Sequence, residues 1–379
     1  MKINDNINGY IVITEPVSTG NAIWAFAKNS KSEHGEIVFI KEYLHPKYPI
    51  TSSPGSRETI KKKLYQCQIF EDHQIKLQRA LYESVIKGGN LVFTLDFFRY
   101  GSIYYKITEK IETSSISIED ISALSNHEKI LIMKTAIHSL GVLHNNNIVH
   151  GDIKPENILI KRSDKYISKL IDFDNSYFSS FPPKSADILG TLEYYSPELS
   201  LYLQGSFDPK HLTILSDIFS LGLVFYQYFT GKLPEFSKLY STPADAIIGG
   251  SPLVINKAVL PESIYILIQR MLSLDYTLRP NSTKILYILQ NWENENVVHM
   301  FDIESKEEDK APSPTLRTTI IRKESPSDEL LLRSSVTSNT IIPPDEPTIK
   351  GSLLERFKKD TVRLIDDSDD EKKKSRMDL

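Results

Sequence analysis

One short segment limits the folds open to this chain more than any other feature. It reads His150-Gly-Asp-Ile-Lys-Pro-Glu-Asn157, and it is followed by the apolar run Ile158-Leu-Ile160 and later by Leu170-Ile-Asp-Phe173. Short apolar runs beside a polar turn predict strands. We therefore expect a tight polar loop pinned by short strands, whose rigid frame aims the loop side chains.

Four polar residues in and after this segment suit one kind of chemistry. Phosphoryl transfer needs a carboxylate to orient the attacking hydroxyl and a cation at the phosphate, which Asp152 and Lys154 could supply. Asn157 and Asp172 offer the oxygen ligands that Mg²⁺ prefers. A solvated charged turn is the alternative interpretation, and the flanking strands and later motifs weigh against it.

The periodicity of the apolar residues changes along the chain. Residues 1–110 contain short β-rich runs, interrupted by helical spacing from about Ser56 to Ile86, and residues 111–292 follow mainly helical spacing. Residues 293–379 are rich in Ser, Thr, Pro and charged residues, which cannot bury enough apolar area to offset ordering entropy. We expect an α+β protein with a β-rich small lobe containing one main helix, a mostly α-helical large lobe, and a disordered C-terminal tail.

Charge and cysteine content exclude some functions. The formal net charge of −4 provides no global attraction to nucleic acid or to an anionic membrane. The single cysteine, Cys67, rules out an intrachain disulfide and a cysteine-based metal cluster. The most apolar stretch, residues 218–229, is too short and too polar to span a bilayer. We expect a cytoplasmic protein with no membrane span and no nucleic-acid partner.

The segment from His150 to Asn157, with the later Asp172-Phe173, resembles the catalytic and metal-binding loops of the eukaryotic-type Ser/Thr protein kinase family. The resemblance covers about residues 8–292 and implies a bilobal kinase fold with ATP and Mg²⁺ as cofactors. It implies that Asp152 is the catalytic base and that Lys154 contacts the phosphate. By the same resemblance Asn157 and Asp172 are the metal ligands.

The small lobe offers counterparts for the ATP-binding residues of this family. Lys41, after Val38-Phe-Ile40, resembles the strand lysine that holds the α- and β-phosphates, although a surface lysine is the alternative. Its carboxylate partner on the long helix is expected to be Glu71, with Glu83 as the second candidate. The loop around Gly20 resembles the phosphate-covering loop, although a plain β-hairpin turn is also compatible with this stretch.

A later segment, Gly190-Thr191-Leu-Glu-Tyr-Tyr-Ser-Pro-Glu198, resembles the end of a kinase activation segment. The resemblance implies that Thr191 reaches the catalytic Asp and Lys and that Glu198 pairs with Arg279. Asp217 resembles the buried aspartate that holds the backbone of the catalytic loop. A helix N-cap at Ser216 or Asp217 is an alternative compatible with this interpretation.

Three positions depart from the family pattern. The loop at Gly20 retains one glycine where three are usual, and Asp174 replaces the glycine after Asp172-Phe173. Gly151 replaces the arginine that commonly clamps an activation-loop phosphate. We therefore predict that phosphorylation of the candidate loop acceptors has little effect on activity. These acceptors are Ser176, Ser179, Ser180 and Ser185.

The expected function is transfer of the γ-phosphoryl group of ATP to Ser or Thr of protein substrates. Two alternatives stay open. The first is an ATP-binding pseudokinase scaffold, which the single-glycine loop and Asp174 suggest. The second is a small-molecule phosphotransferase, which Lys154 and the segment from Thr191 to Glu198 disfavour. In the tail, residues 352–365 have apolar side chains near one helical face and could form a short helix that docks on a partner or on the kinase domain.

Overall fold

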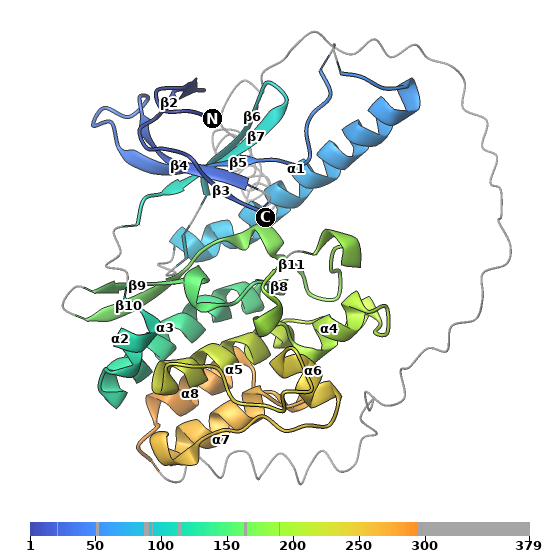
Figure 1. Ribbon diagram of the computed structural model, residues 1–379. Helices are drawn as coiled ribbons and strands as arrows, with labels where there is room; N and C mark the ends of the chain where they lie inside the picture. Colours follow the sequence, from blue (N-terminus) through green and yellow to red (C-terminus); the bar gives the residue numbers. More distant parts are fainter. Residues whose placement is uncertain are drawn as a thin grey trace, which may run out of the picture. The chain divides into compact units, whose positions relative to one another are not determined.

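The computed structural model of the chain is shown in Figure 1. Its described parts form two compact units, one within Met1–Arg79 and Phe93–Ile111 and the other within Ala80–Val92 and Glu112–Ser327. The expected tail and its helix 352–365 lie outside the described residues, as do the side chains of residues 83–86. The structure describes residues 1–20, 22–50, 53–86, 91–92, 94–111, 116–162, 165–188, 190–294 and 297.

The first unit contains a seven-stranded sheet. Its strands are β1 (Asn6–Ile7), β2 (Tyr10–Val12), β3 (Val17–Thr19), β4 (Ala22–Asn29), β5 (Ile37–Tyr43), β6 (Thr94–Tyr100) and β7 (Ile103–Glu109). The strand order is β1-β2-β4-β5-β7-β6, with β3 paired beside β4, and all pairs are antiparallel. Residues alternate between two faces of the sheet, and Val38 and Ile40 point into a buried core with Ala25 and Ala27.

One long helix, α1 (Arg57–Ile86), packs against this sheet, as its apolar periodicity predicts. Phe70 of α1 meets the rings of Tyr43, Phe97 and Tyr104 with centroids 5.1, 5.7 and 5.2 Å away. Cys67 lies one turn earlier and is buried in the same cluster. Aromatic packing therefore fixes this part of α1 on the sheet.

The second unit is mostly helical, as predicted. Its α-helices are α2 (Ile118–Ser122), α3 (Asn126–Asn145), α4 (Pro197–Leu203), α5 (Leu215–Thr230), α6 (Pro243–Ile248), α7 (Glu262–Met271) and α8 (Ser282–Gln290). Ser125 and Glu128 form a capping box that starts α3, and Gly231, with φ of 74°, ends α5. Almost all of α5 is buried, so this helix is the centre of the unit.

Two strand pairs frame the segment from His150 to Asn157, which confirms the predicted frame. The strands are β8 (Ile148–Val149), β9 (Ile158–Arg162), β10 (Tyr166–Leu170) and β11 (Tyr177–Phe178), paired as β8 with β11 and β9 with β10. Short 3₁₀ helices are η1 (Pro155–Asn157), η2 (Phe173–Asn175), η3 (Ser185–Asp187), η4 (Leu192–Tyr194), η5 (Pro209–His211), η6 (Lys257–Val259) and η7 (Tyr276–Leu278). No helix in the described part of the chain is both long and apolar enough to cross a bilayer.

Candidate active site

The polar loop between β8 and β9 brings four of the predicted site residues together. The Lys154 ammonium lies 3.2 Å from Asp152 Oδ2 and donates a hydrogen bond of 2.8 Å to Thr191 Oγ1. The Asn157 amide nitrogen donates to Asp152 Oδ2 at 3.0 Å and to the Asp152 carbonyl at 2.8 Å. A carboxylate, a cation, an amide and a hydroxyl thus form one connected polar cluster.

Asp217 of α5 holds the backbone at the start of this loop. Its carboxylate accepts the backbone N–H groups of His150, at 2.8 Å, and Gly151, at 3.0 Å, and lies 3.0 Å from His144 Nε2. The contacts of Asp217 with His150 and His144 are buried and the contact with Gly151 is partly buried, so losing the carboxylate would leave donors without partners, which is costly. The alternative of an N-cap at Ser216 or Asp217 is wrong, because the N-cap residue of α5 is Ile214 and no side chain caps it.

Asp172 lies at the start of a second loop that is bonded to the first. Ile171 N–H donates to the Asn157 carbonyl at 3.0 Å, and His150 Nε2 lies 3.0 Å from the Ile171 carbonyl. The His150 and Phe173 rings pack edge to face, with centroids 5.3 Å apart. Asp172 adopts a left-handed backbone, with φ of 60° and ψ of 69°. These bonds fix the backbone beside both predicted metal ligands.

The chemistry of Asn157 and Asp172 fits Mg²⁺. The amide nitrogen of Asn157 is used on Asp152, so its Oδ1 is the atom of this side chain that could bind a cation. Mg²⁺ is usually held by one or two protein carboxylates together with substrate phosphates, rather than by a cage of protein ligands. The two residues would hold a cation that neutralises phosphate charge.

Two departures from the family pattern have local explanations. Asp174 lies within the 3₁₀ helix η2 and has no positive φ, so this position does not require glycine. Position 151, in contrast, does require glycine. Its φ is +78°, and a Cβ atom built there would lie only 2.5 Å from the Asn175 carbonyl oxygen.

The segment that carries the candidate phosphate acceptors Ser176, Ser179 and Ser180 is held by contacts that need no phosphate. The Ser179 N–H donates to the Asn147 carbonyl at 2.7 Å, and the Ser180 N–H donates to the Leu212 carbonyl at 2.8 Å. Tyr202 donates to the Pro183 carbonyl at 2.9 Å. Ser176, expected as a candidate acceptor, is buried and donates to the His150 carbonyl at 3.1 Å, so its hydroxyl is engaged in the frame.

Replacing Ser179, Ser180 and Ser185 together by alanine is expected to change basal activity by less than about threefold, because the segment is anchored mainly through backbone groups. Activity is measured as phosphate incorporated per minute, beside a melting curve for each protein. If the triple variant folds normally and loses most of its activity, phosphorylation of this segment is needed after all.

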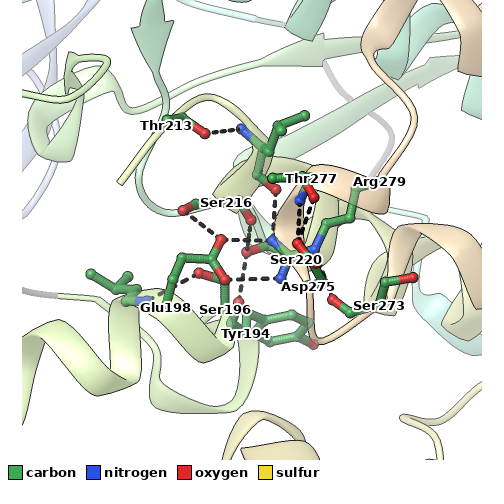
Figure 2. Close-up of polar contacts among 12 residues, drawn as sticks. Tyr194, Ser196, Glu198, Thr213, Ser216, Ser220, Ser273, Asp275, Thr277 and Arg279 are labelled. Atoms are coloured by element: carbon green, nitrogen blue, oxygen red, sulfur yellow. Dashed lines mark hydrogen bonds and ion pairs between the residues drawn. The ribbon is translucent and has the colours of Figure 1, made fainter. Parts of the chain in front are cut away.

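Glu198 and Arg279 form the predicted pair, drawn in Figure 2. Arg279 Nη1 donates to Glu198 Oε1 at 2.6 Å and Nη2 donates to Oε2 at 2.8 Å, and Ser216 adds a third hydrogen bond at 2.9 Å. Arg279 also donates to the backbone carbonyls of Leu215 and Ser273. Burial alone would raise the pKa of the Glu198 carboxyl, but the Arg279 charge and the hydrogen bonds outweigh it, and the pKa is lowered.

The first unit places Lys41 on β5, directly opposite Trp24 of β4. Glu71 accepts a hydrogen bond of 2.6 Å from the Tyr104 hydroxyl, and its pairing with Lys41 stays a prediction. The side chain of Glu83, the second candidate, lies outside the described residues. Gly20, with φ of 52°, follows β3 in the turn that leads to β4, so this segment is a hairpin, and a role in covering phosphates also stays a prediction.

The sequence does not reveal the contacts of three residues that support this arrangement: His144, Ser216 and Tyr104. His144 follows Leu140 by four positions on α3 and both are buried, so helical spacing could have indicated it. Ser216 was considered only as a cap. Tyr104 stands in the apolar run of β7, and nothing in that run indicates a bond to a helix distant in sequence.

The polar loop and its contacts bring together the kinds of side chain that phosphoryl transfer needs. The sequence profile described as "Protein kinase domain" matches residues 53–308, which is more than half of the chain. The chain therefore belongs to the protein kinase family, and the expected resemblance is confirmed. The matched range begins after Gly20 and Lys41, so it gives no support to those two assignments.

The chain is also similar to curated proteins that are named as kinases. The chain is 28% identical over 208 residues to Calcium-dependent protein kinase 4 of Plasmodium berghei, covering 54% of this chain and 36% of that protein. It is 33% identical over 162 residues to Serine/threonine-protein kinase PrkC of Bacillus subtilis, covering 41% of this chain and 24% of that protein. It is 31% identical over 157 residues to the liver/testis isoform of the phosphorylase b kinase gamma catalytic chain of Bos taurus, covering 41% and 35%. The chain thus spans roughly a third or less of the length of these relatives.

Proposed function

We propose that this chain is an ATP- and Mg²⁺-dependent protein kinase that phosphorylates Ser or Thr in protein substrates. The observation that carries the proposal is the bonded cluster of Asp152, Lys154, Asn157 and Thr191. A binding scaffold has no physical need to keep all of these groups in contact. Phosphoryl transfer needs a positioned carboxylate and a cation at the transferred group.

In this proposal each residue has a distinct task. Asp152 orients the attacking hydroxyl and accepts its proton, while Lys154 stabilises charge on the transferred phosphoryl group. The Thr191 hydroxyl keeps the Lys154 ammonium aimed at the reacting groups. Lys41 would hold the α- and β-phosphates, and Asn157 with Asp172 would hold Mg²⁺, which would neutralise charge on the phosphates.

Specificity for Ser and Thr rests on two supporting points. Lys154 and Thr191 resemble the Ser/Thr branch of the family and contact one another at 2.8 Å. PrkC of Bacillus subtilis is named a serine/threonine-protein kinase.

The direct test is incubation of purified full-length chain with γ-labelled ATP, Mg²⁺ and a general protein substrate, beside Asp152→Ala. The variant is expected to lose activity at least about a hundredfold, the order of magnitude of lost general base catalysis. Glu119→Ala, which removes an exposed carboxylate on α2, is the matched control and should retain activity. ATP binding without label transfer in the wild type would instead favour the pseudokinase alternative.

A further inference from the structure

The hairpin of β9 and β10, labelled in Figure 1, concentrates positive charge. Residues 158–170 contain four cationic side chains, Lys161, Arg162, Lys165 and Lys169, and one acidic residue, Asp164. The first three of these cations are exposed. The whole chain, in contrast, has a formal net charge of −4. The hairpin is therefore a local basic surface on an acidic protein.

The register of the hairpin separates a buried face from an outer face. On the buried face, the hydroxyl oxygen of Ser168 lies 2.7 Å from that of Thr135 on α3. Opposite residues of paired strands, and alternate residues of one strand, point to the same face. Ile167, which is 36% exposed, therefore belongs to the outer face. Two aliphatic residues and two lysines share this face: Leu159, Lys161, Ile167 and Lys169.

The C-terminal tail starts at the end of α3 that the hairpin approaches. Trp292 meets the ring of His127 edge on, with centroids 5.3 Å apart, and Glu293 Oε1 lies 3.1 Å from His127 Nε2. In the neighbouring residue Glu128, hydrogen bonds at the helix cap lower the pKa of the carboxyl, and the charge of Arg162 lowers it further. Arg162, at the end of β9, thus acts on the first turn of α3. The start of the tail and the basic hairpin therefore meet at the same end of this helix.

The tail contains a segment of opposite charge. Residues 366–371 read Asp-Asp-Ser-Asp-Asp-Glu, with five acidic residues in six, and they follow the aliphatic pair Leu364-Ile365. Aliphatic and acidic side chains in sequence complement a surface that carries both aliphatic and cationic side chains. A segment tethered through about 70 residues can reach this surface at an effective concentration on the order of 1 mM, so even a weak contact would form.

We propose that the acidic segment 366–371 of the chain's own tail docks on the outer face of the β9–β10 hairpin. A second acidic stretch, residues 304–309, is interrupted by Lys306 and has the lower charge density, so it is the weaker candidate. Exposed ion pairs are individually weak and are screened by salt, so the docked state should be reversible and sensitive to ionic strength. The inference concerns an interaction surface and does not depend on phosphoryl transfer.

Fluorescence anisotropy of a label near the end of the tail provides the test. The full-length protein with Ser375→Cys is labelled under native conditions, where the buried Cys67 is almost inaccessible. Docking restricts the label, so its anisotropy should fall when NaCl is raised from about 0.05 M to about 0.5 M. Introducing Lys161→Glu with Lys165→Glu should lower the docking equilibrium constant about tenfold or more and remove most of the salt dependence.

Two further variants make the result specific. Lys61→Glu with Lys62→Glu is the matched control, because it makes the same charge change on exposed lysines of α1 and should leave the anisotropy unchanged. Asp369→Lys with Asp370→Lys should lower the anisotropy, and combining it with the hairpin variant should restore most of it, because the charges are then exchanged. Melting curves check that each variant is folded. Unchanged anisotropy in the folded hairpin variant, or an equal fall in the α1 control, would overturn the inference.

Cross-linking with a carbodiimide, which joins carboxylates to adjacent lysine amines, identifies the occupant of the hairpin. Isotopically light and heavy full-length proteins are mixed before the reaction, and the products are mapped by mass spectrometry. Cross-links from residues 366–371 to the hairpin lysines are expected within molecules of one isotopic form. Cross-links mainly between light and heavy chains would make a second copy the occupant, and cross-links mainly from residues 304–309 would make it the other acidic stretch. Either of these results would overturn the inference.

Discussion

Replacing Asp172 by alanine is expected to lower Mg²⁺-dependent ATP turnover about a thousandfold or more while the chain stays folded. A metal ligand contributes several kcal/mol of charge stabilisation to the transferred group, which corresponds to this factor in rate. The fold should survive because the neighbouring backbone is held by the Ile171 N–H on the Asn157 carbonyl and by His150 beside the Ile171 carbonyl. Turnover is measured at several Mg²⁺ concentrations, together with the melting temperature.

Glu119→Ala again serves as the control for loss of an acidic side chain. Asp172→Asn is the informative companion, because it keeps the shape but removes the charge, and it should show a raised Mg²⁺ requirement with a smaller loss of rate. Turnover of Asp172→Ala within a few-fold of the wild type would remove Asp172 from the proposed metal site.

Replacing Arg279 by methionine is expected to lower the free energy of unfolding by about 3–5 kcal/mol, because it leaves the fully buried Glu198 carboxylate without its counter-charge. In the wild type, two hydrogen bonds from Arg279 and one from Ser216 satisfy the Glu198 carboxylate. Urea denaturation followed by circular dichroism gives the stability, and label transfer gives the activity. Activity should fall together with stability. Glu198 ends the segment that begins at Thr191, so loosening Glu198 should also loosen the contact of Thr191 with Lys154.

Two comparisons make this result specific. Lys257→Met breaks an exposed ion pair with Glu262, at 2.9 Å, and should leave the stability almost unchanged. The double variant Glu198→Leu with Arg279→Met removes both buried charges and should be more stable than Arg279→Met alone. If Arg279→Met is as stable as the wild type, the pair contributes nothing to the fold.

The same pair predicts a pH dependence. The pKa of Glu198 is lowered in the folded chain, from an ordinary value of 4.5, by the Arg279 charge and hydrogen bonds acting against burial. The folded chain therefore binds a proton at this carboxyl less readily than the unfolded chain. Its contribution to stability is present above the unfolded pKa and is lost as pH falls through the folded pKa. The stability of the wild type relative to the double variant should therefore fall in that acidic range.

Much of the second unit could be predicted from sequence, because its signals are local. The loop from His150 to Asn157 has polar residues at fixed spacing beside apolar runs, and helical periodicity marks α3 and the later helices. Even the pairing of Glu198 with Arg279, 81 residues apart, followed from two motifs that resemble one family.

The first unit was harder to interpret because its important relations cross between strands. The face shared by Trp24, Phe39 and Lys41 depends on the register of β4 against β5, which a single sequence does not determine. In the same way, the bond from Tyr104 to Glu71 depends on how α1 is rotated over the sheet. The expectation that Phe70, Ile75 and Leu81 pack toward the sheet favours Glu71. Phe70 and Ile75 do pack against the cluster on the sheet, and the side chain that bonds to Glu71 is Tyr104.

The buried position of Cys67 makes the chain's own thiol a reporter of how α1 detaches from the sheet. Burial raises the pKa of this thiol, so little reactive thiolate is present at neutral pH, and its side chain is almost inaccessible to reagents. Because Cys67 is the only cysteine in the chain, any modification by a thiol reagent must occur there. The rate of labelling under native conditions therefore measures the free energy of local opening of α1, without any engineered label.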